Sequence, residues 1–291
     1  MKTASPYLAI LRPINGFMVG LAVLIGYLIS LDTPTSIVAN DMIYGFLTGF
    51  LISSSIMVFN DIIDLPIDRI NRPNRPLPSG KIKVIEALVM GIMLGIFGII
   101  FSYLTGMGTL FLALGFWIIG ILYNLYFKGT PLIGNMIVSL SIAIPFIYGA
   151  LMTGDNISDL NTYILAVTAF TINTYREIIK DIADEEGDRG KGLSTLPIIL
   201  GRKRAFYISL VYLFIGLTVG WIPLFIDTGL NKFVYLPILL ISEYLIIKSL
   251  LVLFREGLKE EVILKSKNQC MLGMFLGMLA FLLSKLIILI L

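Results

Sequence analysis

The residues best suited to chemistry are two groups of aspartates that share one spacing. The first group runs from Asp61 to Arg69 and the second from Asp181 to Arg189, and both read D-I-x-D-x-x-x-D-R. On an α-helix, side chains at positions i, i+3 and i+7 lie within roughly 60° of one another, so each motif would present its carboxylates on one face. Crowded carboxylates at the end of an apolar segment need a cation. Because Mg²⁺ prefers carboxylate oxygens and bridges them to phosphates, the pattern favours magnesium binding beside a substrate phosphate.

Each motif stands at the end of an expected helix. Pro66 in the first motif and Gly187 in the second predict that each helix ends before the last aspartate of its motif. A single such motif is equally well explained as a solvated helix end that faces the cytosol. Two copies with matched spacing and a trailing arginine favour the metal-binding interpretation.

A transporter is the competing functional class, because acids inside a membrane often carry protons or Na⁺. The charges inside the expected spans argue against it, since no row of acids crosses the middle of the membrane. Apart from the motif ends, these charges are Arg176, Glu177, Glu243, Lys248 and Lys285.

The elements that position the motifs are expected to be membrane helices. Of the 291 residues, 57% are hydrophobic and only 14% are charged, whereas a soluble domain carries about 25% charge. A helix needs roughly 20 apolar residues to cross the bilayer. The charge-free run from 87 to 127 is long enough for two spans and is expected to break at Gly106-Met107-Gly108. The nine expected spans are 14–31, 42–60, the two within 87–127, 129–154, 160–182, 205–226, 233–254 and 269–290.

Basic residues alternate between the expected loops, and 18 of the 22 fall on one side. Since positive charge collects in cytoplasmic loops, the N-terminus is expected inside and the C-terminus outside. The basic residues on the expected inner side are Lys2, Arg12, Arg69, Arg72, Arg75, Lys81, Lys83, Lys128, Lys180, Arg189, Lys191, Arg202, Lys203, Arg204, Arg255, Lys259, Lys265 and Lys267. The outer loops hold Asp32, Asp41, Asp155, Asp159, Asp227 and Lys232.

Internal repetition accompanies this topology. The two motifs start 120 residues apart, each at the cytoplasmic end of an even-numbered span, which predicts a weak duplication of a four-helix unit. The repeats would cover 1–128 and 129–268, with a ninth helix at 269–291, inside a single domain of residues 1–291. The chain has no histidine and one cysteine, which excludes histidine metal ligands, histidine general bases and an intramolecular disulfide.

The chain resembles the UbiA superfamily of intramembrane prenyltransferases over nearly its whole length. The resemblance rests on Asn60 with Asp64 and Asp68, on the loop N-R-P-x-R-P-L-P-S-G at 71–80, and on the second motif at 181–188. It implies an all-α membrane protein with nine helices around a central cavity, capped on the cytoplasmic side and open laterally to lipid. It also implies a multi-pass protein of the cell membrane whose active site faces the cytoplasm.

Three further segments look most like the archaeal digeranylgeranylglyceryl phosphate synthases: residues 11–15, 176–188 and 195–197. This resemblance implies Mg²⁺-dependent transfer of a geranylgeranyl group from geranylgeranyl diphosphate to the free hydroxyl of geranylgeranylglyceryl phosphate. The product would carry the second ether bond of archaeal membrane lipids. Expected partners are these two substrates and membrane lipid, and not nucleic acid. The alternatives are a prenyltransferase for an aromatic or quinone precursor and a non-enzymatic membrane carrier.

Site residues follow from the motifs and the resemblance together. We expect one Mg²⁺ at each motif with diphosphate oxygens between them, and Asp61 supporting the first set of ligands. The expected metal ligands are Asn60, Asp64, Asp68, Asp181, Asp184 and Asp188, of which Asp64, Asp68, Asp181 and Asp184 are expected to be catalytic. The expected diphosphate contacts are Arg72, Arg75 and Lys128, and the expected acceptor contacts are Arg12 and Asn15. For the basic residues, the alternative is that they only set topology.

Overall fold

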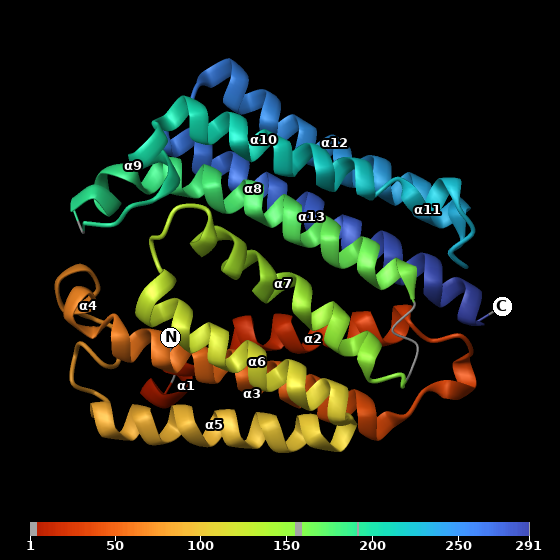
Figure 1. The fold of residues 1–291 in the computed structure, drawn as a ribbon, viewed down its shortest axis with the longest axis horizontal. Helices are drawn as coiled ribbons and strands as arrows, with labels where there is room; N and C mark the ends of the chain where they lie inside the picture. Colours follow the sequence, from red (N-terminus) through yellow and green to blue (C-terminus); the bar gives the residue numbers. More distant parts are fainter. Residues whose placement is uncertain (1–4, 155–158, 191, 291) are drawn as a thin grey trace. The chain divides into compact units, whose positions relative to one another are not determined.

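The protein is helical throughout the part of the chain that its computed structural model describes, residues 5–154, 159–190 and 192–290, and these ranges contain no strand (Figure 1). Three charged residues that entered the prediction of membrane orientation lie outside the described residues: Lys2, Asp155 and Lys191. The N-terminal region holds two short elements, α1 (Pro6–Leu11) and the 3₁₀ turn Pro34–Ser36.

Seven stretches of helix are long and apolar enough to cross a membrane. They are Ala39–Ile63 (α3), Val84–Thr105 (α5), Met107–Phe127 (α6 and the turn after it), Ile133–Leu151 (α7), Arg202–Phe225 (α10 and α11), Lys232–Glu256 (α12) and Glu260–Ile290 (α13). The other two expected spans correspond to α2 (Pro13–Ile29), an apolar helix of 17 residues, and to α8 (Leu160–Gly190), whose last third is charged. Nine spans and the orientation of the termini therefore stay predictions.

Two expected helix ends can be compared with the structure. The break between α5 and α6 is confirmed at Gly106, whose φ of 139° is accessible to glycine and strained for other residues. The expectation that Gly187 ends a helix before Asp188 is wrong, because α8 continues to Gly190. A glycine inside a helix costs only about 1 kcal/mol. Salt bridges from Glu185 to Arg189 and Arg202 hold this last part of α8.

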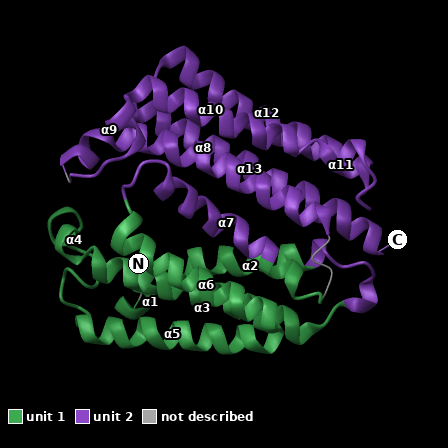
Figure 2. Cartoon of the chain, in the orientation of Figure 1, with its two compact units in different colours: residues 1–27, 37–128, 148–157 green, residues 28–36, 129–147, 158–291 purple. Residues whose placement is uncertain are grey.

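The first compact unit contains the residues up to Tyr27, Ile37–Lys128 and the segment that begins at Tyr148 (Figure 2). Its main contact is between α3 and α5, where small residues allow close approach. The Ser55 hydroxyl donates a 2.7 Å hydrogen bond to the Gly91 carbonyl, and the Trp117 indole donates to Ser55 at 2.9 Å. The unit also contains α4 (Leu65–Asn71), α6 proper (Met107–Leu122) and a π-helical turn at Tyr123–Phe127. The first acidic motif lies at the α3–α4 joint.

The second compact unit contains Leu28–Ser36, Gly129–Ile147 and the chain from Asp159 onward. Here α12 and α13 pack as a pair, with the Ser242 hydroxyl donating to the Gly273 carbonyl at 2.7 Å. The helix α8 packs against α10 (Arg202–Val219), α13 and the short α9 (Leu196–Leu200), with α11 (Ile222–Phe225) following α10. Its core includes Tyr175, Ile178 and Ile182 of α8. This core fixes the helix that carries the second acidic motif.

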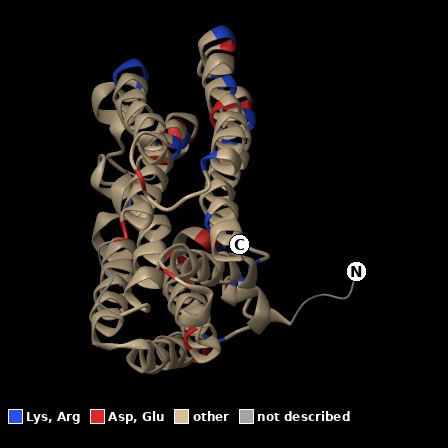
Figure 3. Ribbon diagram, turned by 90° about the vertical axis from the view of Figure 1, so that its right-hand side faces the viewer, with Lys and Arg blue, Asp and Glu red and all other residues tan. Residues whose placement is uncertain are grey.

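Charged residues are few: most of the ribbon in Figure 3 is neither acidic nor basic. Buried charged side chains therefore mark unusual places in this chain. Within the described residues, Asp61, Asp68, Glu177, Glu243 and Lys285 are buried. Three of these five belong to or adjoin the two acidic motifs.

Replacing Gly149 by alanine tests the close contact of α7 with α2. A Cβ at Gly149 would lie 2.1 Å from the Val23 carbonyl oxygen and 2.5 Å from the Tyr27 nitrogen. Because the obstacle is backbone, Gly149→Ala should cost about 1–3 kcal/mol and lower the thermal unfolding midpoint in detergent. Gly115 has no atom within 4 Å of such a Cβ, so Gly115→Ala is the matched control and should keep the midpoint. Equal midpoints for the two variants would contradict the packing described.

Candidate active site

The first acidic motif lies on two helices joined at Asp64. The helix α3 ends at Ile63, Asp64 has φ −78° and ψ −3°, and α4 starts at Leu65. Pro66 stands in the first turn of α4, where its missing N–H has no helical partner to lose. The prediction that the helix ends before Asp68 is therefore confirmed for this motif. The expectation that its aspartates share one helical face is wrong, since Asp68 belongs to the second helix.

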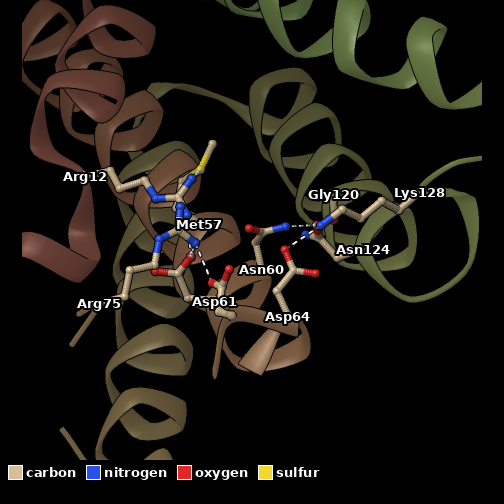
Figure 4. A network of polar contacts seen from close by, with 10 residues as sticks. Arg12, Met57, Asn60, Asp61, Asp64, Arg75, Gly120, Asn124 and Lys128 are labelled. Atoms are coloured by element: carbon tan, nitrogen blue, oxygen red, sulfur yellow. Dashed lines mark hydrogen bonds and ion pairs between the residues drawn. The ribbon is translucent and has the colours of Figure 1, made fainter. Parts of the chain in front are cut away.

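Each carboxylate of this motif is paired with a basic side chain from elsewhere in the unit (Figure 4). The Arg75 Nη1 donates to Asp68 at 2.5 Å and lies 3.4 Å from Asp61. Arg12 forms an ion pair with Asp61, and Lys128 forms one with Asp64. Asp61 and Asp68 are 4% and 6% exposed, so they need such partners to remain charged.

The loop after α4 holds Arg75 in place by ordinary packing. Leu77 is buried in a cluster with Ile10, Val58 and Ile82. Turn hydrogen bonds close the loop, with the Ser79 and Lys81 amides donating to the carbonyls of Arg75 and Pro76 at 3.0 Å. Because Ile10 belongs to α1, the same cluster also fixes the segment that carries Arg12.

Asn60 is oriented by a residue that the sequence analysis missed. Its amide donates a 2.6 Å hydrogen bond to Asn124, which donates in turn to the Gly120 carbonyl at 3.0 Å. Asn124 is buried in the π-helical turn at Tyr123–Phe127, and such turns often mark functional sites. The available signal was an asparagine inside an apolar span, which needs a polar partner. The pairing leaves the side-chain oxygen Oδ1 of Asn60 without a hydrogen-bond partner among the described residues.

The second motif lies within α8 and has a different set of contacts. The side-chain amide of Asn135 donates to Asp181 at 2.6 Å, and the side-chain oxygen Oδ1 of Asn135 is buried without a partner in the described part of the chain. Asn135 is the second residue that the sequence analysis missed. Asp184 is exposed and Asp188 is half-buried.

Glu185 connects α8 to the start of α10 rather than to the expected metal ligands. It accepts hydrogen bonds from Arg202 at 2.5 Å and Arg189 at 3.0 Å. The hydrogen bond from Arg202 is the largest cause that lowers the pKa of Glu185 from its ordinary value, with burial acting in the opposite direction.

The donor atoms of both motifs suit Mg²⁺. Asn60 and the aspartates supply only oxygen, and the amide oxygens of Asn60 and Asn135 have no hydrogen-bond partner among the described residues. The side chains described do not place three acidic groups close enough together to hold a metal ion. In the first motif, Arg75 and Lys128 instead occupy the carboxylates, so the residues fit the metal by chemistry while their charges are balanced by the chain's own cations.

Of the basic residues and the asparagine predicted to contact the substrates, some lie at the first motif and others do not. Arg75 and Lys128 are brought to the first motif, as expected of diphosphate ligands beside metal ligands. Arg72 is exposed at the end of α4 and forms no ion pair with a described residue. Arg12 is held by Asp61 and also contacts the Met57 sulfur at 3.5 Å, whereas Asn15 is exposed on α2. The roles of all five stay predictions.

Comparisons with known proteins agree in sequence and in fold. A family model described as UbiA prenyltransferase family matches residues 19–279. A protein of Thermococcus sibiricus named digeranylgeranylglyceryl phosphate synthase is 38% identical over 236 residues, covering 81% of this chain and 82% of that protein. One of Pyrococcus abyssi with the same name is 34% identical over 96% of this chain and 97% of its own length.

Solved structures include similar folds. A structure described as giving insights into digeranylgeranylglyceryl phosphate synthase in membranes is 30% identical, has a TM-score of 0.84 and covers 98% of this chain and 99% of its own. A UbiA homologue from Archaeoglobus fulgidus, solved with GPP and Mg²⁺, is 22% identical with a TM-score of 0.73, covering 95% of this chain and 99% of its own, and shares the fold.

Asp61→Asn tests whether that buried carboxylate holds the first motif together. The change leaves Arg12 without its ion-pair partner, while Arg75 keeps Asp68. Removing one partner of a buried pair costs about 3 kcal/mol. We expect a lower thermal unfolding midpoint and reduced turnover. Glu256→Gln removes an exposed acid at the end of α12 and should change neither. An Asp61→Asn midpoint equal to that of wild type would mean that the pairing is not structural.

Proposed function

Because this chain belongs to the UbiA prenyltransferase family, we propose that it transfers a geranylgeranyl group from geranylgeranyl diphosphate to the free hydroxyl of geranylgeranylglyceryl phosphate. The chain is an all-α, multi-pass membrane prenyltransferase. The finer assignment rests on relatives with that name at 34–38% identity over most of both chains. The proposal includes an active site on the cytoplasmic side, supported by the concentration of basic residues in the loops near both motifs.

In the proposed reaction, the bond between the first prenyl carbon and the diphosphate oxygen breaks and both electrons leave with pyrophosphate. The acceptor oxygen then bonds to that carbon and loses its proton. Bound Mg²⁺ would supply positive charge to the departing pyrophosphate. Asn60, Asp64 and Asp68 would hold one ion, and Asp181, Asp184 and Asp188 a second. The Mg²⁺- and GPP-containing relative supports a metal and a prenyl diphosphate here.

The basic residues have a role that their position supports. Arg75 and Lys128 already lie at the carboxylates of the first motif, so a diphosphate bound there would be within reach of both. Their guanidinium and ammonium groups can donate to phosphate oxygens. Arg72, exposed one turn after Asp68, is the third proposed contact. The departing proton would go to a motif aspartate or to pyrophosphate, since the chain has no histidine.

Reconstituted protein with labelled geranylgeranyl diphosphate, Mg²⁺ and one acceptor at a time tests the proposal. Geranylgeranylglyceryl phosphate should give the doubly prenylated product, and chelation of Mg²⁺ should stop its formation reversibly. Product formed only with 4-hydroxybenzoate or a naphthoate would establish the aromatic alternative instead. Solute flux without release of pyrophosphate would establish a carrier.

Alanine at Asp64 or Asp184 tests the metal assignment. Each change removes an oxygen ligand without removing a buried core residue, so turnover should fall by at least about a hundredfold while the thermal midpoint stays near that of wild type. Asp227→Ala, at an exposed turn outside both motifs, is the control and should remain active. Near-normal turnover in Asp64→Ala or Asp184→Ala would show that these aspartates are only helix ends.

A further inference from the structure

A second polar group lies on α8 before the acidic motif and has no role in the reaction as described so far. It consists of Asn173, Arg176, Glu177 and Lys180, all in the second compact unit. Asn173 is fully buried and Glu177 is 8% exposed. Buried charged groups in an apolar chain are costly, so their presence calls for a reason.

Arg176 is held firmly from one side only. Its Nη1 donates to Glu177 at 2.8 Å and to Asn173 at 3.2 Å. The Asn173 amide donates in turn to the Ser139 hydroxyl at 3.2 Å. The planar guanidinium is thereby fixed in orientation by two buried neighbours.

The other edge of this guanidinium is unused. The Nε atom is buried without a hydrogen-bond partner, and no contact within the described residues engages Nη2. In a guanidinium, the N–H bonds of Nε and Nη2 point the same way and match two oxygens of a phosphate. Leaving a buried donor unpaired costs roughly 1–3 kcal/mol. An arginine with one edge fixed and the other free is built to receive an anion.

Lys180 provides a second positive charge one helical turn further along. Its Nζ lies 3.4 Å from Glu177, and its side chain is 42% exposed. Glu177 therefore contacts both cations and can neutralise only one of them. Lys180 also interacts electrostatically with Asp181 and Asp184, so it connects this group to the second acidic motif.

We propose that the free edge of Arg176, oriented by Asn173 and Glu177 and assisted by Lys180, binds the phosphate of the acceptor. The proposal rests on the proposed function. Its geometry fits the substrate: Arg176 precedes Asp181 by five residues, about 7.5 Å along a helix axis. Lys180 is adjacent to Asp181 in the chain and interacts electrostatically with Asp181 and Asp184. A phosphate held by Arg176 with help from Lys180 would therefore bring the acceptor to the part of α8 that carries the second acidic motif.

Arg12, the acceptor contact expected from sequence, is less free than Arg176. Arg12 engages both of its Nη atoms, one with buried Asp61 and the other with the Met57 sulfur, whereas Arg176 uses only Nη1 for its two partners. The same free edge could also bind the diphosphate, because both ligands offer phosphate oxygens. The experiment must therefore separate the two substrates.

Steady-state kinetics of Arg176→Gln with three substrates makes this separation. We expect KM for geranylgeranylglyceryl phosphate to rise about tenfold or more, with KM for geranylgeranyl diphosphate within about twofold of wild type. Geranylgeranylglycerol, which lacks the phosphate, should be a poor acceptor for wild type. The variant should use this acceptor at the same rate as wild type does. Arg255→Gln, an exposed arginine at the end of α12, is the matched control and should keep wild-type values.

Other outcomes would overturn the inference. A rise confined to KM for geranylgeranyl diphosphate would assign Arg176 to the diphosphate, and unchanged discrimination between the two acceptors would assign it a structural role. If Arg12→Gln, and not Arg176→Gln, lost the preference for geranylgeranylglyceryl phosphate over geranylgeranylglycerol, the acceptor phosphate would be assigned to Arg12. If Arg176→Gln does not fold, Arg176→Lys keeps the charge without the paired N–H groups and should lose part of the discrimination. Wild type inactive on geranylgeranylglyceryl phosphate would instead refute the proposed function.

Discussion

The first acidic motif depends on the pairing of carboxylates with cations at the end of an apolar helix. Asp61 and Asp68 are buried, and a buried carboxylate without a partner is too costly to keep. The partners come from three separate segments: Arg12 before α2, Arg75 in the loop after α4, and Lys128 after the π-helical turn. Three loops are thereby tied to one helix end. The same contacts place Arg75 and Lys128 beside the proposed metal ligands.

Apolar packing and neutral hydrogen bonds make this pairing possible. The packing of Leu77 in the cluster with Ile10 holds the segments of Arg12 and Arg75. The hydrogen bond between Asn60 and Asn124 holds the turn that precedes Lys128. Charges alone would not give a unique arrangement, because long basic side chains adopt many rotamers. Buried anchors restrict the backbone first, and the ion pairs then have only one geometry to form.

The sequence was informative where one residue decides the structure locally. Gly106 could be predicted as a helix break because few other residues accept its φ of 139°. Gly187 could not be read in the same way, since the salt bridges of Glu185 to Arg189 and Arg202 favour continuing the helix. Contacts between distant segments were also beyond reach. The aspartates could be proposed as candidates from their spacing, and Arg75 and Lys128 from their residue type and loop position. Asn124 and Asn135 could not, because their partners are 64 and 46 residues away.

The expected duplication stays a prediction, and two features besides the motif repeat at the same spacing. Arg12 and Leu132 are 120 residues apart, like the motifs, and are the non-glycine residues with positive φ in the described ranges. They directly precede α2 and α7. Each half also holds the first aspartate of its motif from the start of that helix, but by different chemistry: Arg12 contacts Asp61, while Asn135 contacts Asp181. A guanidinium neutralises a carboxylate, whereas an amide only orients it. If the halves are repeats, the first has fixed its leading aspartate as a structural ion pair, and the second has kept its own available to a bound cation.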